Sequence, residues 1–153
     1  MDARNSRKSD QRTRLIHYTL PGGWQVLAGR TDADNDRLSL EIARPDDWWF
    51  HVRGMPGSHV LLQARAGEHP DRATLKRAAA IAAYHSKART AGLVAVSCTR
   101  ARFVTKPRGA KPGTVEIRKE EILKVRPEQP EPTAGDNTDS VSLAPAADRE
   151  ELP

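Results

Sequence analysis

The pattern of apolar and polar positions predicts a chain of short strands interrupted by two helices. Residues 17–20 and 24–27 are rich in β-forming side chains, and the proline and two glycines at 21–23 suit a tight turn, so these stretches predict a β-hairpin. The acidic run that follows favours a short helix over about residues 33–41, because carboxylates stabilise the first turn of a helix. Pro45 is expected to end it.

A second pair of strands and a longer helix occupy the middle of the chain. Residues 47–53 and 58–63 predict two strands, joined by a turn at 54–57 that contains two glycines and a proline. Alanines then recur at helical spacing over roughly residues 71–90, and such small side chains allow a helix backbone to lie close to a sheet. Gly92 is expected to end this helix.

Four further stretches of β-forming residues complete the predicted sheet. They are residues 93–99, 101–105, 114–117 and 122–125. Strands and helices follow one another in a mixed order, which indicates an α+β fold. We expect a single small sheet, mixed or antiparallel, with the long alanine-rich helix and the short helix packed on it.

The distribution of charge divides the chain into three segments. Residues 1–14 carry a net charge of +3 without apolar periodicity, whereas residues 127–153 carry −6 and contain five prolines. We expect a disordered basic arm and a disordered acidic tail on either side of one folded domain, residues 15–126. The whole chain carries +5, so removing the arm and the tail leaves +8 on that domain. Such a surface favours a phosphate-rich partner, and the simpler alternative is a basic surface that serves only solubility.

Composition also narrows the class of protein. The 153 residues contain no apolar stretch of about 18 residues, and polar and basic residues follow Met1, so we expect a cytoplasmic protein without a membrane partner. The single cysteine, Cys98, lies within an apolar run, which indicates a packed thiol rather than a nucleophile or a metal ligand. A disulfide within the chain is impossible.

Residues 43–59, which include the turn-forming residues 56–59, hold two of the three tryptophans among prolines, glycines, histidines and arginines. Trp48 and Trp49 are neighbours on a predicted strand, so their side chains point to opposite faces and cannot both stack on a base. We expect Trp48 to pack in the core. The exposed edge of this stretch would then consist of His51, Arg53 and the turn, whose donors suit the phosphates and bases of a nucleic acid.

A second candidate stretch is the loop at 106–113, which is rich in proline and glycine and expected to be exposed. Its glycines allow backbone amides to approach an anion, and Lys106, Arg108 and Lys111 are donors for phosphate. The loop does not match the Gly-x4-Gly-Lys-Ser/Thr pattern of nucleotide-binding loops. The alternative interpretation is a solvated hairpin loop whose charges serve solubility.

Two other classes of function stay open at this point. An enzyme that cleaves phosphodiesters would use His51, His59 and Asp46 or Asp47 as general acid and base, or as metal ligands. Their spacing matches no recognised metal site, so we expect no metal, no other cofactor and no catalytic residue. The third class is a protein-docking module that binds a ribosomal protein through the acidic tail, and it predicts binding that survives ribonuclease treatment.

Several motifs occur in a definite order along the folded domain. They are Trp24-x-Val26-Leu27-x-Gly29-Arg30, Asn35-Asp36-x-Leu38, Asp47-Trp48-Trp49-Phe50-His51, Pro56-Gly57-Ser58-His59-Val60, Ala79-Ala80-x-Ala82-Ala83-Tyr84-x-Ser86 and Lys106-x-x-Gly109-Ala110-Lys111-Pro112-Gly113. In this combination the chain resembles the NFACT-R domain family, the RNA-binding module of ribosome-associated quality-control proteins, over about residues 16–126.

The resemblance implies a non-catalytic domain that binds RNA, with tRNA or rRNA as the expected ligand, the large ribosomal subunit as an expected site and no binding to DNA. The residues expected to contact RNA are Arg30, His51, Arg53, Gly57, Ser58, His59, Lys106, Arg108 and Lys111. The longer members of the family carry an N-terminal domain and a helical coiled coil before this module, and here 14 residues precede Leu15. Tailing of peptides on stalled ribosomes is therefore not expected.

Overall fold

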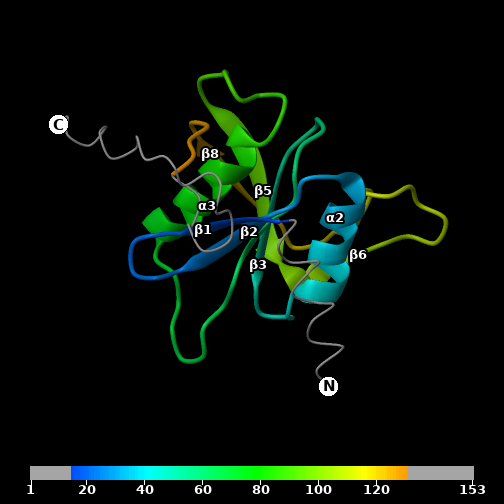
Figure 1. Ribbon diagram of the computed structural model, residues 1–153, viewed down its shortest axis with the longest axis horizontal. Helices are drawn as coiled ribbons and strands as arrows, with labels where there is room; N and C mark the ends of the chain where they lie inside the picture. Colours follow the sequence, from blue (N-terminus) through cyan, green and yellow to red (C-terminus); the bar gives the residue numbers. More distant parts are fainter. Residues whose placement is uncertain (1–14, 131–153) are drawn as a thin grey trace.

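The computed structural model describes residues 15–130 (Figure 1). The predicted basic arm, residues 1–14, and the acidic tail from residue 131 onward lie outside the described residues. Within the described part of the chain, strands form a central sheet and helices cover both of its faces.

The predicted hairpin is confirmed as β1 (Ile16–Thr19) and β2 (Gln25–Ala28), which pair antiparallel. Gly22 and Gly23 in the connecting turn adopt φ angles of 89° and 83°, which residues with a Cβ rarely adopt. The glycines therefore allow the chain to reverse direction within the short connection.

Six strands make up the main sheet, and every neighbouring pair is antiparallel. Their order across the sheet is β1-β2-β4-β3-β5-β8. The other four are β3 (Trp48–Val52), β4 (Val60–Leu62), β5 (Val94–Arg100) and β8 (Glu121–Val125). The predicted α+β class is confirmed.

The predicted strand that follows β5 divides into two elements. Its first part is a 3-10 turn, η2 (Ala101–Phe103), and its second part is β6 (Val104–Thr105), which pairs with β7 (Glu116–Ile117). The backbone N–H of Ala101 bonds to the carbonyl of Asp47 at 2.8 Å, and this bond holds the turn beside the start of β3. The chain leaves the main sheet here, so a separate two-stranded sheet forms where the sequence predicts one sheet.

The long helix, α3 (Arg72–Tyr84), begins as predicted but is shorter. Its first turn is capped by Asp71, whose side chain accepts a hydrogen bond from the backbone N–H of Thr74. It ends well short of the predicted boundary. The chain turns away after Tyr84, and the carbonyl of His85 accepts a hydrogen bond from the backbone N–H of Ser58 at 3.0 Å instead of extending the helix.

Helices cover the two faces of the sheet (Figure 1). On one face, α3 packs over a large core that includes Phe50, Val52 and Ile81. On the other face lie α2 (Asp32–Arg37) and the π-helical turn η1 (Leu38–Ile42), close to the predicted short helix. The buried residues of this second core are Leu15, Leu27, Leu38 and Leu61.

Cys98 lies in the larger core, and its burial raises the pKa of the thiol to about 12. The prediction of a packed thiol is therefore confirmed. No helix among residues 15–130 is long and apolar enough to cross a membrane.

Candidate nucleic-acid interface

The two tryptophans of β3 point to opposite faces of the sheet, as strand alternation predicts. Trp48 packs against the larger core, as expected, and the guanidinium of Arg100 lies 3.8 Å from the centre of its ring. Trp49 is buried on the other face, where its ring N–H donates to Ser39 Oγ at 2.8 Å. Trp49 is therefore enclosed within the fold, and one face of the half-buried Trp48 ring is already covered by Arg100.

His59 is only 2% exposed, and its Nδ1 lies 2.7 Å from Ser39 Oγ. Trp49 donates to the same oxygen, so the two rings share Ser39 as a hydrogen-bond partner. Burial, and then the neighbouring His51, lowers the pKa of His59 to about 4. The prediction that His59 lies on an exposed edge is wrong, because η1, which carries Ser39, covers this face of the sheet.

A hollow of about 260 Å³ lies beside these rings, and we name it the loop-side hollow. Its lining residues are Trp49, His51, Val52, Arg53, Gly54, His59, Ser97, Gly113, Thr114, Val115, Ile117 and Glu120. His51 is half-buried, with its ring centre 6.0 Å from that of Trp49, and burial lowers its pKa. Arg53 is exposed, but its guanidinium lies 3.5 Å from the carboxylate of Glu120. The predicted edge is thus narrower and more engaged in internal contacts than the sequence indicates.

Of the residues of the enzyme alternative, His51 and His59 lie together, with ring centres 5.3 Å apart, but the aspartates do not join them. Both carboxylate oxygens of Asp47 accept backbone hydrogen bonds, from Arg44 at 2.8 Å and from Ala64 at 2.7 Å. Asp47 also lines a different hollow from the one that contains His51 and His59. No group of three or more potential metal ligands occurs among residues 15–130.

The loop at 106–113 presents two of its three predicted bases. Lys106 Nζ donates to the carbonyls of Lys111 and Thr114 at 2.6 and 3.1 Å and lies 3.2 Å from the carboxylate of Asp36. The ammonium therefore links the two ends of the loop to each other and to α2, and its side chain stays partly exposed. Arg108 and Lys111 are exposed, and within the described part of the chain neither side chain has an ion-pair partner.

The same loop is attached to α2 through Gly113. Its backbone N–H donates to Asp36 Oδ1 at 3.0 Å, and its φ angle is 87°. A Cβ at this position would lie 2.8 Å from a carboxylate oxygen of Asp32, so a side chain would push the loop away from the helix. Glycine therefore holds the loop in place at this position.

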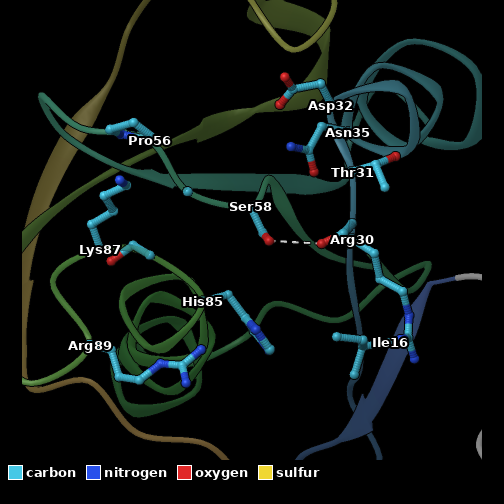
Figure 2. Close-up of a pocket in the computed structure, with 13 residues that line it drawn as sticks. Ile16, Arg30, Thr31, Asp32, Asn35, Pro56, Ser58, His85, Lys87 and Arg89 are labelled. Atoms are coloured by element: carbon cyan, nitrogen blue, oxygen red, sulfur yellow. Dashed lines mark hydrogen bonds between the residues drawn. The ribbon is translucent and has the colours of Figure 1, made fainter.

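A larger hollow of about 470 Å³ lies between the end of α3 and the start of α2, and we name it the helix-end pocket (Figure 2). Its lining residues are Ile16, Gly29, Arg30, Thr31, Asp32, Asn35, Pro56, Gly57, Ser58, His85, Ser86, Lys87 and Arg89. Three of the predicted RNA contacts, Arg30, Gly57 and Ser58, meet here. The other six lie at the loop-side hollow or on the loop, so the structure divides the predicted site into two regions.

Backbone contacts between the turn and the end of α3 build the wall of this pocket. Gly57 pairs with Ser86 in an antiparallel bridge, and a Cβ on Gly57 would lie only 2.9 Å from the Cβ of Ser86. Ser58 connects this wall to the segment after β2, because its hydroxyl donates to the carbonyl of Gly29 at 2.7 Å. Gly57 and Ser58 thus shape the pocket.

Three cations surround the helix-end pocket. Arg30, Lys87 and Arg89 are all exposed, and Asp32 is the one carboxylate among the lining residues. Arg89 lies 4.5 Å from the ring centre of Tyr84 and donates through Nε to the carbonyl of that residue at 3.0 Å. The pocket is therefore cationic on balance.

His85, at the end of α3, is linked to β1 and to the end of the described chain. Its Nε2 lies 2.6 Å from the hydroxyl of Tyr18, which in turn accepts a hydrogen bond from Gln129 at 2.8 Å. Burial, and then Arg89 and Arg30, lowers the pKa of His85 to about 4. Burial raises the pKa of Tyr18 to about 12.

The sequence pattern does not mark His85, Lys87 and Arg89 as site residues, because the predicted helix extends past them. A helix would have placed the two cations on solvated faces. The available signal was the loss of the alanine pattern after Ala83, where a polar run begins.

Residues 14–119 match the family described as NFACT protein RNA binding domain. The chain is 39% identical to the Rqc2 homolog RqcH of Bacillus subtilis (strain 168) over 114 residues, which are 74% of this chain and 20% of that protein. It is 35% identical to the Rqc2 homolog RqcH of Streptococcus suis (strain 05ZYH33) over 125 residues, 81% of this chain and 22% of that protein. The chain thus spans about a fifth of the length of these curated relatives.

A solved structure has the same fold. The C-terminal part of the fibronectin/fibrinogen-binding protein from Streptococcus suis superposes with a TM-score of 0.71 at 35% sequence identity. The match covers 75% of this chain and 46% of the solved one.

Proposed function

The chain belongs to the NFACT protein RNA binding domain family, and on this premise we propose that it binds tRNA or rRNA as a non-catalytic module of ribosome quality control. The two relatives from Bacillus subtilis and Streptococcus suis are Rqc2 homologs, which supports this setting. Action at the ribosome, with the large subunit as its site, would place the protein in the cytoplasm.

The observation that supports RNA binding best is the set of cations around the helix-end pocket that form no ion pair with a carboxylate among residues 15–130. Arg30 and Lys87 have no ion-pair partner among residues 15–130, and Arg89 stacks on a tyrosine rather than on a carboxylate. Other exposed arginines of the same domain, Arg72 and Arg102, bond to carboxylates. Cations left without an internal partner can bind phosphates without breaking a bond within the fold.

The tip of the 106–113 loop would add a second set of phosphate contacts through Arg108 and Lys111. Two separated basic surfaces suit a folded RNA that presents phosphates at several points, and they do not require a particular base sequence. Binding is then expected to weaken as the salt concentration rises, because each phosphate contact releases counterions.

The test is binding of the full chain to tRNA, measured across a series of salt concentrations. The Arg30→Ala, Lys87→Ala, Arg89→Ala variant should bind at least about 30-fold more weakly at low salt, and the slope of log affinity against log salt should decrease because fewer counterions are released. A matched control removes three exposed cations outside both hollows, Lys76, Arg77 and Lys124, and should change affinity far less. Equal losses in the two variants would show that only net charge matters.

Ribonuclease treatment separates RNA binding from protein docking. Association with ribosomes that is lost after the treatment supports the proposal, whereas association that survives it supports docking on a ribosomal protein. Labelled RNA that stays intact during incubation with the protein, with or without EDTA, is expected for a binding module.

A further inference from the structure

The proton positions along the link between Gln129, Tyr18 and His85 can be assigned from its donors. The amide of Gln129 donates to the Tyr18 oxygen at 2.8 Å. The Tyr18 hydroxyl has a single proton, and the next atom along the link is His85 Nε2, at 2.6 Å. The Tyr18 oxygen could also accept a second hydrogen bond, but Tyr18 is fully buried and its hydroxyl proton has no other acceptor among residues 15–130. We therefore assign Tyr18 as the donor and His85 Nε2 as the acceptor.

A neutral imidazole carries one proton, and the one on His85 must then be on Nδ1. The low pKa of His85 keeps its ring neutral near pH 7, which is consistent with this assignment. Among residues 15–130, Nδ1 has no hydrogen-bond partner, although His85 lines the helix-end pocket. The fold thus fixes a neutral N–H donor there and leaves it unused.

Figure 2 shows how this donor lies relative to the charged groups. His85, Lys87 and Arg89 come from the segment that follows α3 on one side, and Arg30 comes from the segment after β2 on the other. Asp32 lies on the α2 side, so the end of α3 is the side that favours an anion. The volume of about 470 Å³ falls in the range of pockets that hold small molecules.

We propose that the helix-end pocket is a subsite for one phosphate group of the bound RNA, with His85 Nδ1–H as a neutral donor to a phosphate oxygen and Arg30, Lys87 and Arg89 as its counter-charges. This inference rests on the proposed function, because it names the part of the RNA that the pocket holds. A phosphate has several acceptor oxygens, so it can bond to donors that approach from both sides of the pocket. A single-point acceptor would leave most of these donors unused.

A neutral donor and a cation affect RNA binding differently, and this difference gives the test. His85→Ala should weaken tRNA binding about 3- to 10-fold and leave the salt slope unchanged, since no charge is lost. Lys87→Ala should weaken binding and also reduce the slope, because a cation near the phosphate is lost. Unchanged affinity in a folded His85→Ala protein would overturn the proposal.

Conservative variants separate the donor from the bulk of the ring. His85→Asn places an amide where the Nδ1–H lies, so it should bind tRNA more tightly than His85→Ala. Tyr18→Phe removes the hydroxyl that directs the imidazole proton, so it should weaken tRNA binding with an unchanged salt slope. Equal binding by the alanine and asparagine variants would show that the donor is not used.

Nitrogen NMR of the wild-type full chain tests the same points without any variant. The His85 ring should show a protonated Nδ1 and an unprotonated Nε2, and titration with inorganic phosphate or a ribonucleoside 5′-monophosphate should shift the Nδ1 signal most. A proton on Nε2, or no response at His85, would overturn the subsite. If phosphate shifts Nδ1 but no RNA binds, the subsite stands for a free phosphate or nucleotide and the proposed RNA function fails.

Discussion

The loop-side hollow and the helix-end pocket contain similar kinds of residue but differ in how many hydrogen bonds are already made. Each contains a histidine of lowered pKa, at least one arginine and at least one glycine. In the loop-side hollow, His59 bonds to Ser39 and Arg53 approaches Glu120. In the helix-end pocket, two of the three cations and one histidine nitrogen have no such partner among residues 15–130.

The difference shows which donors are free for a ligand. A buried donor with an internal partner contributes to stability, and a ligand could use it only by breaking that bond. An accessible donor without a partner can bind a ligand at no such cost. The loop-side hollow is therefore expected to affect stability, and the helix-end pocket to affect binding.

The largest effect is expected in the loop-side hollow, from Ser39→Ala. The change leaves the ring N–H of Trp49 and Nδ1 of His59 without their shared partner in a buried site, so the free energy of unfolding should fall by about 2–3 kcal/mol. Urea unfolding measures it, with the exposed Thr90→Ala as a control. A loss no larger than that of the control would contradict the structural role of this network.

The two lowered histidine pKa values predict a loss of stability in acid. In the folded state His59 and His85 have pKa values of about 4, below the ordinary value of 6.5. The unfolded chain therefore binds more protons between these values, so stability is complete above pH 6.5 and falls as pH decreases toward 4.

The buried His59 should account for about 2–3 kcal/mol of that loss. Urea unfolding at pH 7 and pH 4.5 measures it. His59→Gln should be less stable at pH 7 but should show a shallower decline with pH. The same pH dependence in both proteins would exclude His59 as the cause.

Gly57→Ala tests the wall of the helix-end pocket. The added Cβ would meet the Cβ of Ser86 at 2.9 Å, so the turn must move away from the end of α3. We expect about 1–2 kcal/mol of destabilisation together with weaker tRNA binding. Gly67→Ala is the control, because a Cβ at that position meets nothing within 4 Å. The φ of 76° at Gly67 disfavours alanine, so this variant should also be destabilised, but away from the pocket. It should leave tRNA affinity unchanged.

The smallest effects compare two lysines of one loop. Lys111→Ala should weaken tRNA binding about 2- to 5-fold and leave the thermal midpoint unchanged, because its exposed side chain has no ion-pair partner among the described residues. Lys106→Ala should instead lower the thermal midpoint by a few degrees, because three internal contacts are lost. The reverse pattern would contradict the division of roles within the loop.

Local patterns predicted most of the secondary structure and failed where distant segments meet. The glycine turn at 21–23 and the alanine spacing of α3 act over a few residues, and both predictions are confirmed. The predicted end of α3 was wrong, because the backbone N–H of Ser58, far away in the sequence, donates to the carbonyl of His85.

The same difference between local patterns and contacts of distant segments applies to the candidate site. Strand alternation was enough to separate the faces of Trp48 and Trp49, because it is a property of the extended backbone itself. His59 is buried against Ser39, which lies in a different element. Lys106 forms an ion pair with Asp36, which is also distant in the sequence. Neither contact leaves a local pattern in the sequence.

The sequence by itself determined the α+β class, the basic charge of the folded domain and the family, since composition, periodicity and ordered motifs are properties of the chain alone. Only the tertiary structure decided which basic and histidine side chains are left without partners. That outcome depends on contacts between segments distant in sequence, which place Arg30 across one pocket from His85 and Lys87 and enclose His59 beneath η1.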